Sequence, residues 1–441
     1  MTVPAPPRVR RLAVHTREVE PIDDILSHAD PHSPLAWLRR GEGFIGLGCL
    51  TTLEVGGRRP GPDEGTQAAA LAEMWRSVCD AASVDDDMRM PGTGLVAFGA
   101  LAFDTSSRAT SSLVVPRLVL GRRDGRSWIT RIHVEGTEAT ATDAGLPAAA
   151  PWGAPWSAAL GPGSLDAPGY EAAVEGALAA IAAGEVSKVV LARDLAGTVP
   201  ADADLRRLVR ALSTGYPDVW TYAVDGIIGA SPETLVTVHG GSVTARVLAG
   251  TAPRGADPDA DTAASLALAD SDKDQDEHGY AVRSVMASLR PHTTALAATD
   301  QPFTLKLPNV WHLATDIEGD LAGGTTALDL VGALHPTAAV AGTPTPAALE
   351  VIRRLEPFDR GRYAGPVGWI DAHGDGEWAI ALRCAQFAAA DDDGDDGWRF
   401  GPDAARAVTA HAGAGIVAGS DPEAELLETR MKFRPIIDAL A

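Results

Sequence analysis

The chain has 441 residues, and its hydrophobic fraction of 45% is enough for a substantial core in one large domain or in two or three ordinary ones. With 59 acidic residues against 37 lysines and arginines, the formal net charge is −22, which disfavours nucleic acid and anionic membranes as partners because the overall field repels both. The start of the chain lacks a signal-peptide core, the longest apolar run (94–103) is too short to span a bilayer, and the three cysteines lack CxxC spacing, so we expect a cytoplasmic protein without membrane segments, disulfides or zinc.

The first part of the chain reads as antiparallel strands. Segments such as GFIGLGCLTTLEV and SSLVVPRLVL are separated by turns rich in glycine and aspartate, with one helix around 65–82. Residues 137–166 are rich in alanine, proline and glycine and lack a pattern, which is typical of a connector. A helix then shows Tyr170 and Val174 on one face and ends at Gly184.

The second part mixes strands and helices. It contains the strand VSKVVLAR, a hairpin around 239–241, two helices between about 260 and 290, and a pair of strands at 365–388. The tip of a last hairpin, DDDGDDG, has the wrong spacing for a calcium loop and reads as a solvated turn. The pattern predicts an α+β fold with large antiparallel sheets flanked by helices.

A charged helix follows the glycine-rich segment AGAGIVAGS near the end of the chain. Ser420 is expected to cap it, with Glu423 completing a capping box. Helical spacing places Glu425, Glu428 and Lys432 on one face. That face is either solvated, with a Glu428–Lys432 ion pair, or it offers carboxylates to a divalent cation beside an anion-binding backbone.

The helix at 271–290 raises the same question. Its apolar stripe, extended backwards at helical spacing, leads to Asp274, Glu277 and His278, so carboxylates point where the core should be. Burying a carboxylate costs several kcal/mol (roughly) unless it is paired or ligated. Either a metal compensates for this cost, or the helix emerges from the core at its first turn, where acids also suit the helix dipole.

Four further side chains have two readings each. Lys188 lies on an apolar strand face, as a general base could, but edge strands often carry such a lysine. Glu233 lies in a Pro turn between two strands and can be a turn residue. Arg383 alternates with buried positions, and an arginine so placed normally has an anionic partner. His312 by itself suits a hydrogen-bonded core position better than catalysis.

The order of several motifs is more specific than any of them alone. SKVVLAR, SPETL, LAGTAPRG, KDQDEH, NVWHLAT, HPTAAVAGTP, YAGPVGW, ALRCA and GAGIVAGSDPEAELLET follow one another as they do in the chorismate-utilising enzymes, which the chain resembles closely from about 165 to 435. It is most similar to the isochorismate synthases, and GEGFIGLG and LVAFGALAFD extend the likeness into the N-terminal part.

The resemblance implies an anthranilate synthase component I-like chorismate-binding fold. An N-terminal, mainly antiparallel part (1–150) and a chorismate-binding catalytic region (165–436) would intertwine around one cleft that holds one Mg²⁺. The metal ligands would be Glu277 and Glu428, with Glu425 and Asp274 close by or holding metal-bound water. The substrate-binding residues would be Gly250, Thr251, Thr343, Tyr363, Arg383, Gly413, Gly415 and Lys432.

The same resemblance implies the chemistry. Lys188 would activate water for attack at C2 of chorismate, Glu233 would protonate the departing C4 hydroxyl, and His312 would position the ring. Lys188 stands where ammonia-using relatives carry glutamine, and Ala249 stands where the aminodeoxychorismate type carries a nucleophilic lysine. Both differences favour water as the nucleophile. Salicylate synthases share Lys188 and Glu233 and remain the alternative, although they usually differ at AVAGTP (339–344).

A catalytically silent binding protein of the same fold would have lost its acid, base or metal ligands, and none is lost here. We expect a monomer coupled functionally to an isochorismate-consuming enzyme. The sequence leaves open whether its product feeds menaquinone or siderophore biosynthesis.

Overall fold

The fold is that of a computed structural model, which is described over residues 11–56, 66–136, 145–306, 310–388 and 405–441. The side chains of Thr251, Lys273, Glu277 and Val310 are not among those described. The loop tip at 391–397 also lies outside the described residues.

The N-terminal part is built from strands with one α-helix. Leucine, valine and tryptophan alternate with polar residues in its strands, and Thr66 caps the helix through the Ala69 amide. Its elements are β1 (Leu12–Val19), η1 (Ile25–His28), β2 (Leu35–Arg39), β3 (Glu42–Gly56), α1 (Gln67–Asp80), β4 (Ala82–Asp86), β5 (Val96–Ala100), β6 (Thr110–Arg123) and β7 (Arg126–Val134).

The longer second part alternates strands and helices. Its first elements are β8 (Gly161–Pro162), α2 (Ala167–Ala182), β9 (Lys188–Pro200), α3 (Arg206–Gly215), β10 (Trp220–Val224), β11 (Ile227–Ser231), β12 (Thr234–His239), β13 (Ser242–Pro253), α4 (Pro258–Ala269), α5 (Asp272–Leu289) and η3 (Arg290–His292). They continue with β14 (Thr293–Ala298), β15 (Phe303–Lys306), β16 (Val310–Leu321), α6 (Ala327–Leu334), β17 (Gly342–Thr343), α7 (Thr345–Leu355), β18 (Pro366–Asp371), β19 (Gly376–Ile380), β20 (Cys384–Phe387), β21 (Ala405–Val417) and α8 (Pro422–Leu440).

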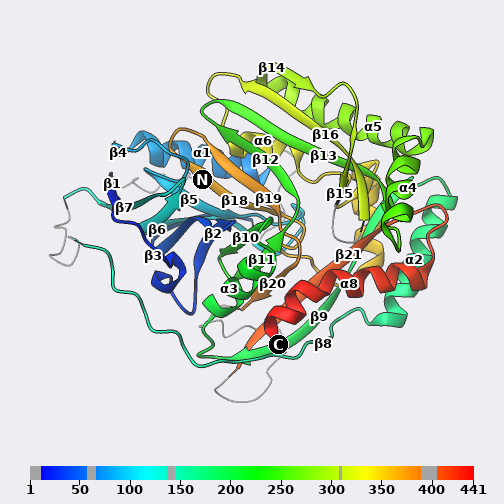
Figure 1. Ribbon diagram of the computed structural model, residues 1–441, viewed down its shortest axis with the longest axis horizontal. Helices are drawn as coiled ribbons and strands as arrows, with labels where there is room; N and C mark the ends of the chain where they lie inside the picture. The colour runs from blue at the N-terminus through cyan, green and yellow to red at the C-terminus, as the bar shows by residue number, and fades with distance from the viewer. Residues whose placement is uncertain (1–10, 57–65, 137–144, 307–309, 389–404) are drawn as a thin grey trace, which may run out of the picture.

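The strands pair mostly antiparallel, and β1 with β4 is a parallel pair. The pairs β2–β10 and β5–β18 join strands of the N-terminal part to strands of the second part. Helices lie around the sheets, as Figure 1 shows for α1 and α6 near the N-terminal strands and for α2, α4, α5 and α8 on the other side. The expectation of large antiparallel sheets flanked by helices is confirmed.

The longest ladder of the second part joins β9 to β21, in register from Pro200 opposite Ala405 to Lys188 opposite Val417. Buried side chains of α8, including Leu426 and Phe433, turn towards the protein interior, and α8 runs beside β21 with α2 next to it (Figure 1). This packing brings the charged first turns of α8 close to the glycine-rich end of β21.

Several details differ from the sequence prediction. Asp421, not Ser420, caps α8, accepting the Ala424 amide, while the Ser420 hydroxyl accepts the Val417 amide. An aspartate side chain caps as well as serine does, so the helix begins one residue later than expected. The segment 365–388 forms three strands, not two, because the chain breaks again before Cys384.

Candidate active site

Lys188 is the first residue of β9 and has strand partners on both sides. It lies opposite Thr343 of β17 and opposite Val417 of β21. The alternative of an edge-strand lysine is therefore wrong, since an edge strand lacks a neighbour on one side. The side chain is partly buried and crosses Gly415, where an added Cβ would come within 3.2 Å of Lys188 Cε and 3.9 Å of Nζ.

The pairing pattern also orients the Gly415 amide. Antiparallel strands point successive backbone groups to alternate neighbours. The Val190 amide donates to Ala341 O at 2.9 Å, away from β21, so its partner Gly415 points its own N–H away from β9. On that side β20 pairs with β21 from Val408 to His411, and Gly413 and Gly415 lie beyond the end of that ladder. The Gly415 N–H is thus directed towards the side of the sheet where Arg383 precedes β20.

Arg383 lies in the break between β19 and β20, which corrects its expected place within a strand. Its φ of +49° is in the left-handed region, which is strained for a residue with a side chain and typical of functional sites. Burial lowers the pKa of the guanidinium, and the Glu233 and Glu428 carboxylates act in the opposite direction. No ion pair involves Arg383 among the described residues, so the anionic partner expected from the sequence is not a nearby carboxylate of that set.

Glu233 lies between β11 and β12, as predicted. Its amide is held by Ser231 Oγ at 3.2 Å, and its carbonyl accepts the Ile380 amide at 3.0 Å. Burial raises the pKa of the carboxyl group, and the positive charges of Arg383, Lys188 and Lys432 partly oppose this. The turn therefore fixes the backbone and leaves a buried carboxyl group with a raised pKa near the side chains of Arg383, Lys188 and Lys432.

His312 lies opposite Thr251 in the β13–β16 pair, and its Nδ1 is 3.3 Å from Gly250 O. Burial lowers its pKa, so the ring is neutral near pH 7. Gly250 has a φ of +75°, and an added Cβ would meet Asp274 Cβ at 3.3 Å. The first turn of α5 thus packs directly on the bulge that carries Gly250 and Thr251.

The carboxylates on α8 and α5 have different surroundings. Glu428 pairs with Lys432, Oε1 to Nζ at 2.6 Å, and Lys432 also donates to Gly413 O at 2.8 Å. Burial and the charge of Glu428 raise the pKa of Glu425. On α5, Asp274 accepts the hydroxyl of the capping Ser271 at 2.5 Å, and Glu277 follows one turn later with a side chain outside the described set.

Mg²⁺ prefers carboxylate oxygens, and the described carboxylates Glu425 and Glu428 on α8 offer donors of that kind. Glu425 and Glu428 repel each other on one helix face, which a cation between or beside them would relieve. No group of three or more His, Cys, Asp or Glu side chains close enough to hold a metal occurs among the described side chains, which do not include Glu277. His278, on the same predicted stripe, is a buried histidine bonded to Ala249 O at 3.1 Å and Thr315 Oγ1 at 2.7 Å.

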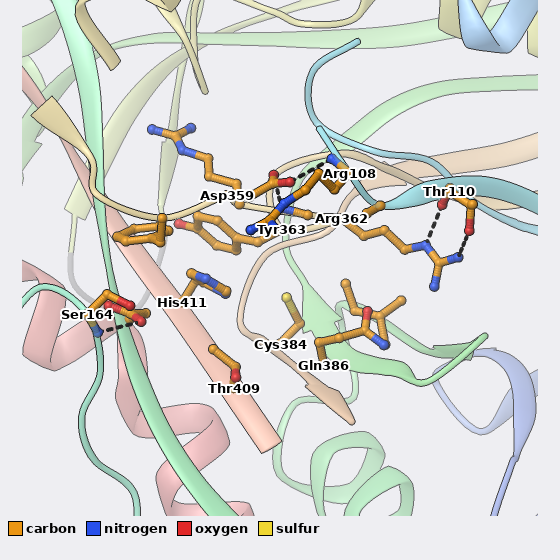
Figure 2. Close-up of a pocket in the computed structure, with 16 residues that line it drawn as sticks. Arg108, Thr110, Ser164, Asp359, Arg362, Tyr363, Cys384, Gln386, Thr409 and His411 are labelled. Carbon is orange, nitrogen blue, oxygen red and sulfur yellow. Dashed lines mark hydrogen bonds between the residues drawn. The ribbon is translucent and has the colours of Figure 1, made fainter. Parts of the chain in front are cut away.

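Tyr363 is close enough to Arg383 for an electrostatic effect and also lines a cavity of about 770 Å³. Its ring stacks on His411 of β21, with centroids 5.1 Å apart (Figure 2). Asp359, Arg360, Cys384 and Gln386 line the cavity too, whereas Lys188, Glu233 and Arg383 are not among its lining residues. The cavity therefore adjoins the predicted site at Tyr363.

The sequence analysis missed Glu356, Arg360 and His411. Glu356 and Arg360 lie four positions apart and carry opposite charges, which was a signal of pairing. Nothing in the sequence places His411 against Tyr363. Among the predicted site residues, the structure brings Lys188, Glu233, His312, Arg383, Glu428 and Lys432 close enough for mutual electrostatic effects.

Comparison with known proteins agrees with this arrangement. The model of the family described as chorismate binding enzyme matches residues 35–441. The chain belongs to the chorismate-binding enzyme family. It is 41% identical over 283 residues to isochorismate synthase DhbC of Bacillus subtilis, covering 62% of this chain and 67% of that protein. It is 39% identical over 374 residues to the putative isochorismate synthase MenF of Mycobacterium tuberculosis, covering 82% of this chain and 90% of that one.

Solved structures support the fold. The menaquinone-specific isochorismate synthase MenF of Escherichia coli matches with a TM-score of 0.73 and 26% identity, over 97% of this chain and 95% of that one. Anthranilate synthase component I of Streptococcus pneumoniae matches with a TM-score of 0.59 and 20% identity, over 99% and 93% of the two chains. The predicted family and fold are confirmed. None of the described helices has the length and apolar character needed to cross a membrane.

Proposed function

We propose that the protein is an isochorismate synthase, which converts chorismate to isochorismate. The observation that carries the proposal is the placement of a base and an acid in one site. Lys188 lies over Gly415, and Glu233 is close enough to Lys188, Lys432 and Arg383 for their charges to affect its pKa. Replacing a ring hydroxyl by water requires a base that activates the water and an acid that protonates the leaving hydroxyl. Lys188 is a basic side chain, and Glu233 is a carboxyl group with a raised pKa. The relatives that carry this name support the same reaction.

The reaction balances as one water added and one water lost. Lys188 Nζ takes a proton from the attacking water as its oxygen bonds to C2 of the ring. Both conjugated ring double bonds shift, C1=C2 to C1=C6 and C5=C6 to C4=C5, as the C4–O bond breaks, and the carboxyl group of Glu233 gives its proton to the departing hydroxyl. Glu233 can supply that proton because burial favours its protonated form.

The chain's remaining site residues would hold the substrate. Arg383 and the Gly415 N–H, which points to the side of the sheet where Arg383 precedes β20, suit the enolpyruvyl carboxylate, and Tyr363 is close to Arg383. The neutral ring of His312 would position the substrate ring, next to the bulge of Gly250 and Thr251. Thr343, opposite Lys188, holds the start of β9 through Ser187, whose amide donates to Thr343 O at 2.8 Å.

We assign Glu277 and Glu428 as ligands of Mg²⁺, with Glu425 and Asp274 next to them. When bound, Mg²⁺ would neutralise and orient the ring carboxylate of a dianionic substrate in a protein of net charge −22. Lys432 would balance the carboxylate cluster, since it already bridges Glu428 and Gly413 O.

The test is to incubate the purified protein with chorismate and Mg²⁺ and to separate the products by HPLC. We expect isochorismate in equilibrium with chorismate. A coupled lactate dehydrogenase assay should detect little pyruvate near neutral pH, because hydration needs only the base, the acid and the metal. Stoichiometric pyruvate with fluorescent salicylate would identify a salicylate synthase instead, and binding of chorismate without turnover would identify a silent binding protein.

A further inference from the structure

A buried ion pair, Glu356–Arg360, lies next to the strand that carries Lys188. Glu356 follows the last residue of α7, and Arg360 is four residues further along. The guanidinium grips both carboxylate oxygens, Nε to Oε2 at 2.8 Å and Nη2 to Oε1 at 2.5 Å. Only 2% of the Glu356 side chain and 3% of the Arg360 side chain are exposed. Because a buried pair rarely stabilises a fold more than well-packed apolar residues would, stability alone does not account for it.

The pair completes the hydrogen bonding of β9. Residues 341–343 cover the start of β9 through β17 and through the Val190 amide, which donates to Ala341 O. Beyond that point the side chains of Arg360 and Glu356, in place of a neighbouring strand, bind the backbone of β9. Arg360 Nη2 donates to Val190 O at 2.7 Å, and the Ala192 amide donates to Glu356 Oε1 at 2.8 Å. These contacts fix the backbone two and four residues after Lys188.

The same arginine also contacts the segment before β17 and the turn that carries Tyr363. Its Nη1 donates to Val340 O at 3.0 Å, and its own carbonyl accepts the Tyr363 amide at 3.0 Å. The guanidinium also lies over the Phe103 ring, 4.4 Å from the ring centroid. Its flat face is therefore held by a cation–π contact, and its edges are held by hydrogen bonds. One residue therefore connects the strand of Lys188 to the turn of Tyr363.

We propose that Glu356 and Arg360 are positioning residues that set Lys188 relative to Tyr363 and Arg383. The inference rests on the proposed function, because only that function gives Lys188, Tyr363 and Arg383 catalytic or substrate-binding roles that depend on their relative positions. Neither Glu356 nor Arg360 is placed in contact with the reacting atoms. The planar fork of arginine is required, since it serves a carboxylate and two carbonyl oxygens at once, which the single ammonium group of lysine cannot do.

The experiment compares Arg360→Lys and Glu356→Gln with wild type and with Arg354→Lys, a control that changes an arginine of α7 in an exposed ion pair with Glu185. Steady-state kinetics of isochorismate formation and thermal unfolding are measured on the same preparations. Misplacement of a catalytic group by about 1 Å can cost roughly 10²-fold in rate. We expect kcat to fall about tenfold or more in both variants, with KM nearly unchanged and with cooperative unfolding well above the assay temperature.

Chemical rescue adds a readout that a merely structural role would not move. Arg360 lines the cavity of about 770 Å³, so added guanidinium has a route to the space that Arg360→Ala leaves. Millimolar guanidinium should restore part of the lost kcat in this variant and should not activate the wild type or the Arg354→Lys control. Ammonium at the same concentration should have little effect, because it lacks the planar fork.

The outcomes separate the two proposals. Normal kcat in folded Glu356→Gln would overturn the positioning role, and this isosteric variant decides the matter if the Arg360 variants do not fold. A lower melting temperature with normal kcat per folded enzyme would also overturn it. Wild-type protein that binds chorismate but forms no isochorismate would instead refute the proposed function, and the positioning role would fall with it.

Discussion

The side chain of Lys188 lies across the backbone of Gly415, so close that a methyl group on the glycine would be 3.2 Å from Lys188 Cε. The two residues belong to neighbouring strands, β9 and β21, and the glycine-rich segment is what allows the lysine to cross. This contact gives one reason for the glycine at the end of β21. Without a side chain, Gly415 leaves room for the lysine and leaves its backbone amide accessible to an anion.

We expect Gly415→Ala to lower kcat about tenfold, since general-base catalysis contributes roughly 10²–10⁴-fold and the added methyl group displaces the amine without removing it. The amide remains, so KM for chorismate should change less than kcat. Steady-state kinetics check this, with Gly215→Ala at the end of α3, where an added Cβ meets nothing within 4 Å, as the control. Unchanged kcat would mean that the amine does not act from this position.

Replacing the lysine itself should have a larger effect. Lys188→Ala should lower kcat by about 10²–10⁴-fold while chorismate binding, followed by calorimetry, stays measurable, because the side chain acts on water rather than on the substrate. A loss smaller than about tenfold would make Lys188 a structural lysine. Strand pairing on both sides of Lys188 should preserve the fold of the variant.

Glu233→Gln should be equally damaging in both directions of the reaction, because the acid of one direction is the base of the other. Burial raises the pKa of Glu233, so the acid stays protonated to higher pH than an ordinary glutamate does. Forward kcat should fall as the pH rises through that pKa, and this descending limb should be absent from the residual activity of the variant. The exposed Glu20→Gln is the control. A variant with normal rates would mean that another group protonates the leaving hydroxyl.

The sequence predicted the sheet-and-helix order well because its strands and helices have clear apolar periods and turn residues. It predicted Glu233 in its turn and gave the Glu428–Lys432 pair as one of two alternatives, since both depend on residues close in sequence. It placed Arg383 in a strand, because local pattern does not reveal a left-handed backbone at a non-glycine residue. The contacts of Glu356 and Arg360 with β9 could not be predicted from local pattern, because they join residues 164 and 170 positions apart.

Removal of the metal should abolish turnover. The Glu425 and Glu428 carboxylates share a helix face, and the raised pKa of Glu425 reflects burial and the charge of Glu428. EDTA should therefore stop isochorismate formation, and added Mg²⁺ should restore it. Glu428→Gln should raise the Mg²⁺ concentration needed for half-maximal activity, whereas Glu423→Gln, an exposed change in the first turn of α8, should not. Full activity after exhaustive chelation would refute the metal assignment.

Asp371, at the end of β18, should make the fold less stable at higher pH. Its side chain is buried, with 4% of the residue exposed, and accepts the amides of His373 at 2.8 Å and Asp375 at 3.0 Å through Oδ1. Burial and the charge of Asp375 raise its pKa to about 8. In an unfolded chain an aspartate has a pKa of about 3.9. The folded protein therefore binds the extra proton between about pH 4 and 8, and its stability falls as the pH rises through this window.

Asp371→Asn keeps the acceptor oxygen and removes the charge, so it should be more stable than wild type at pH 8.5, with the advantage shrinking towards pH 4. Thermal unfolding across this range checks the prediction, with the exposed Asp300→Asn as the control. One pKa unit corresponds to about 1.4 kcal/mol, so a shift of this size should change the melting temperature by a measurable amount. A difference between variant and wild type that does not depend on pH would show that Asp371 is ionised in the folded protein throughout, with its charge satisfied by the two amides alone.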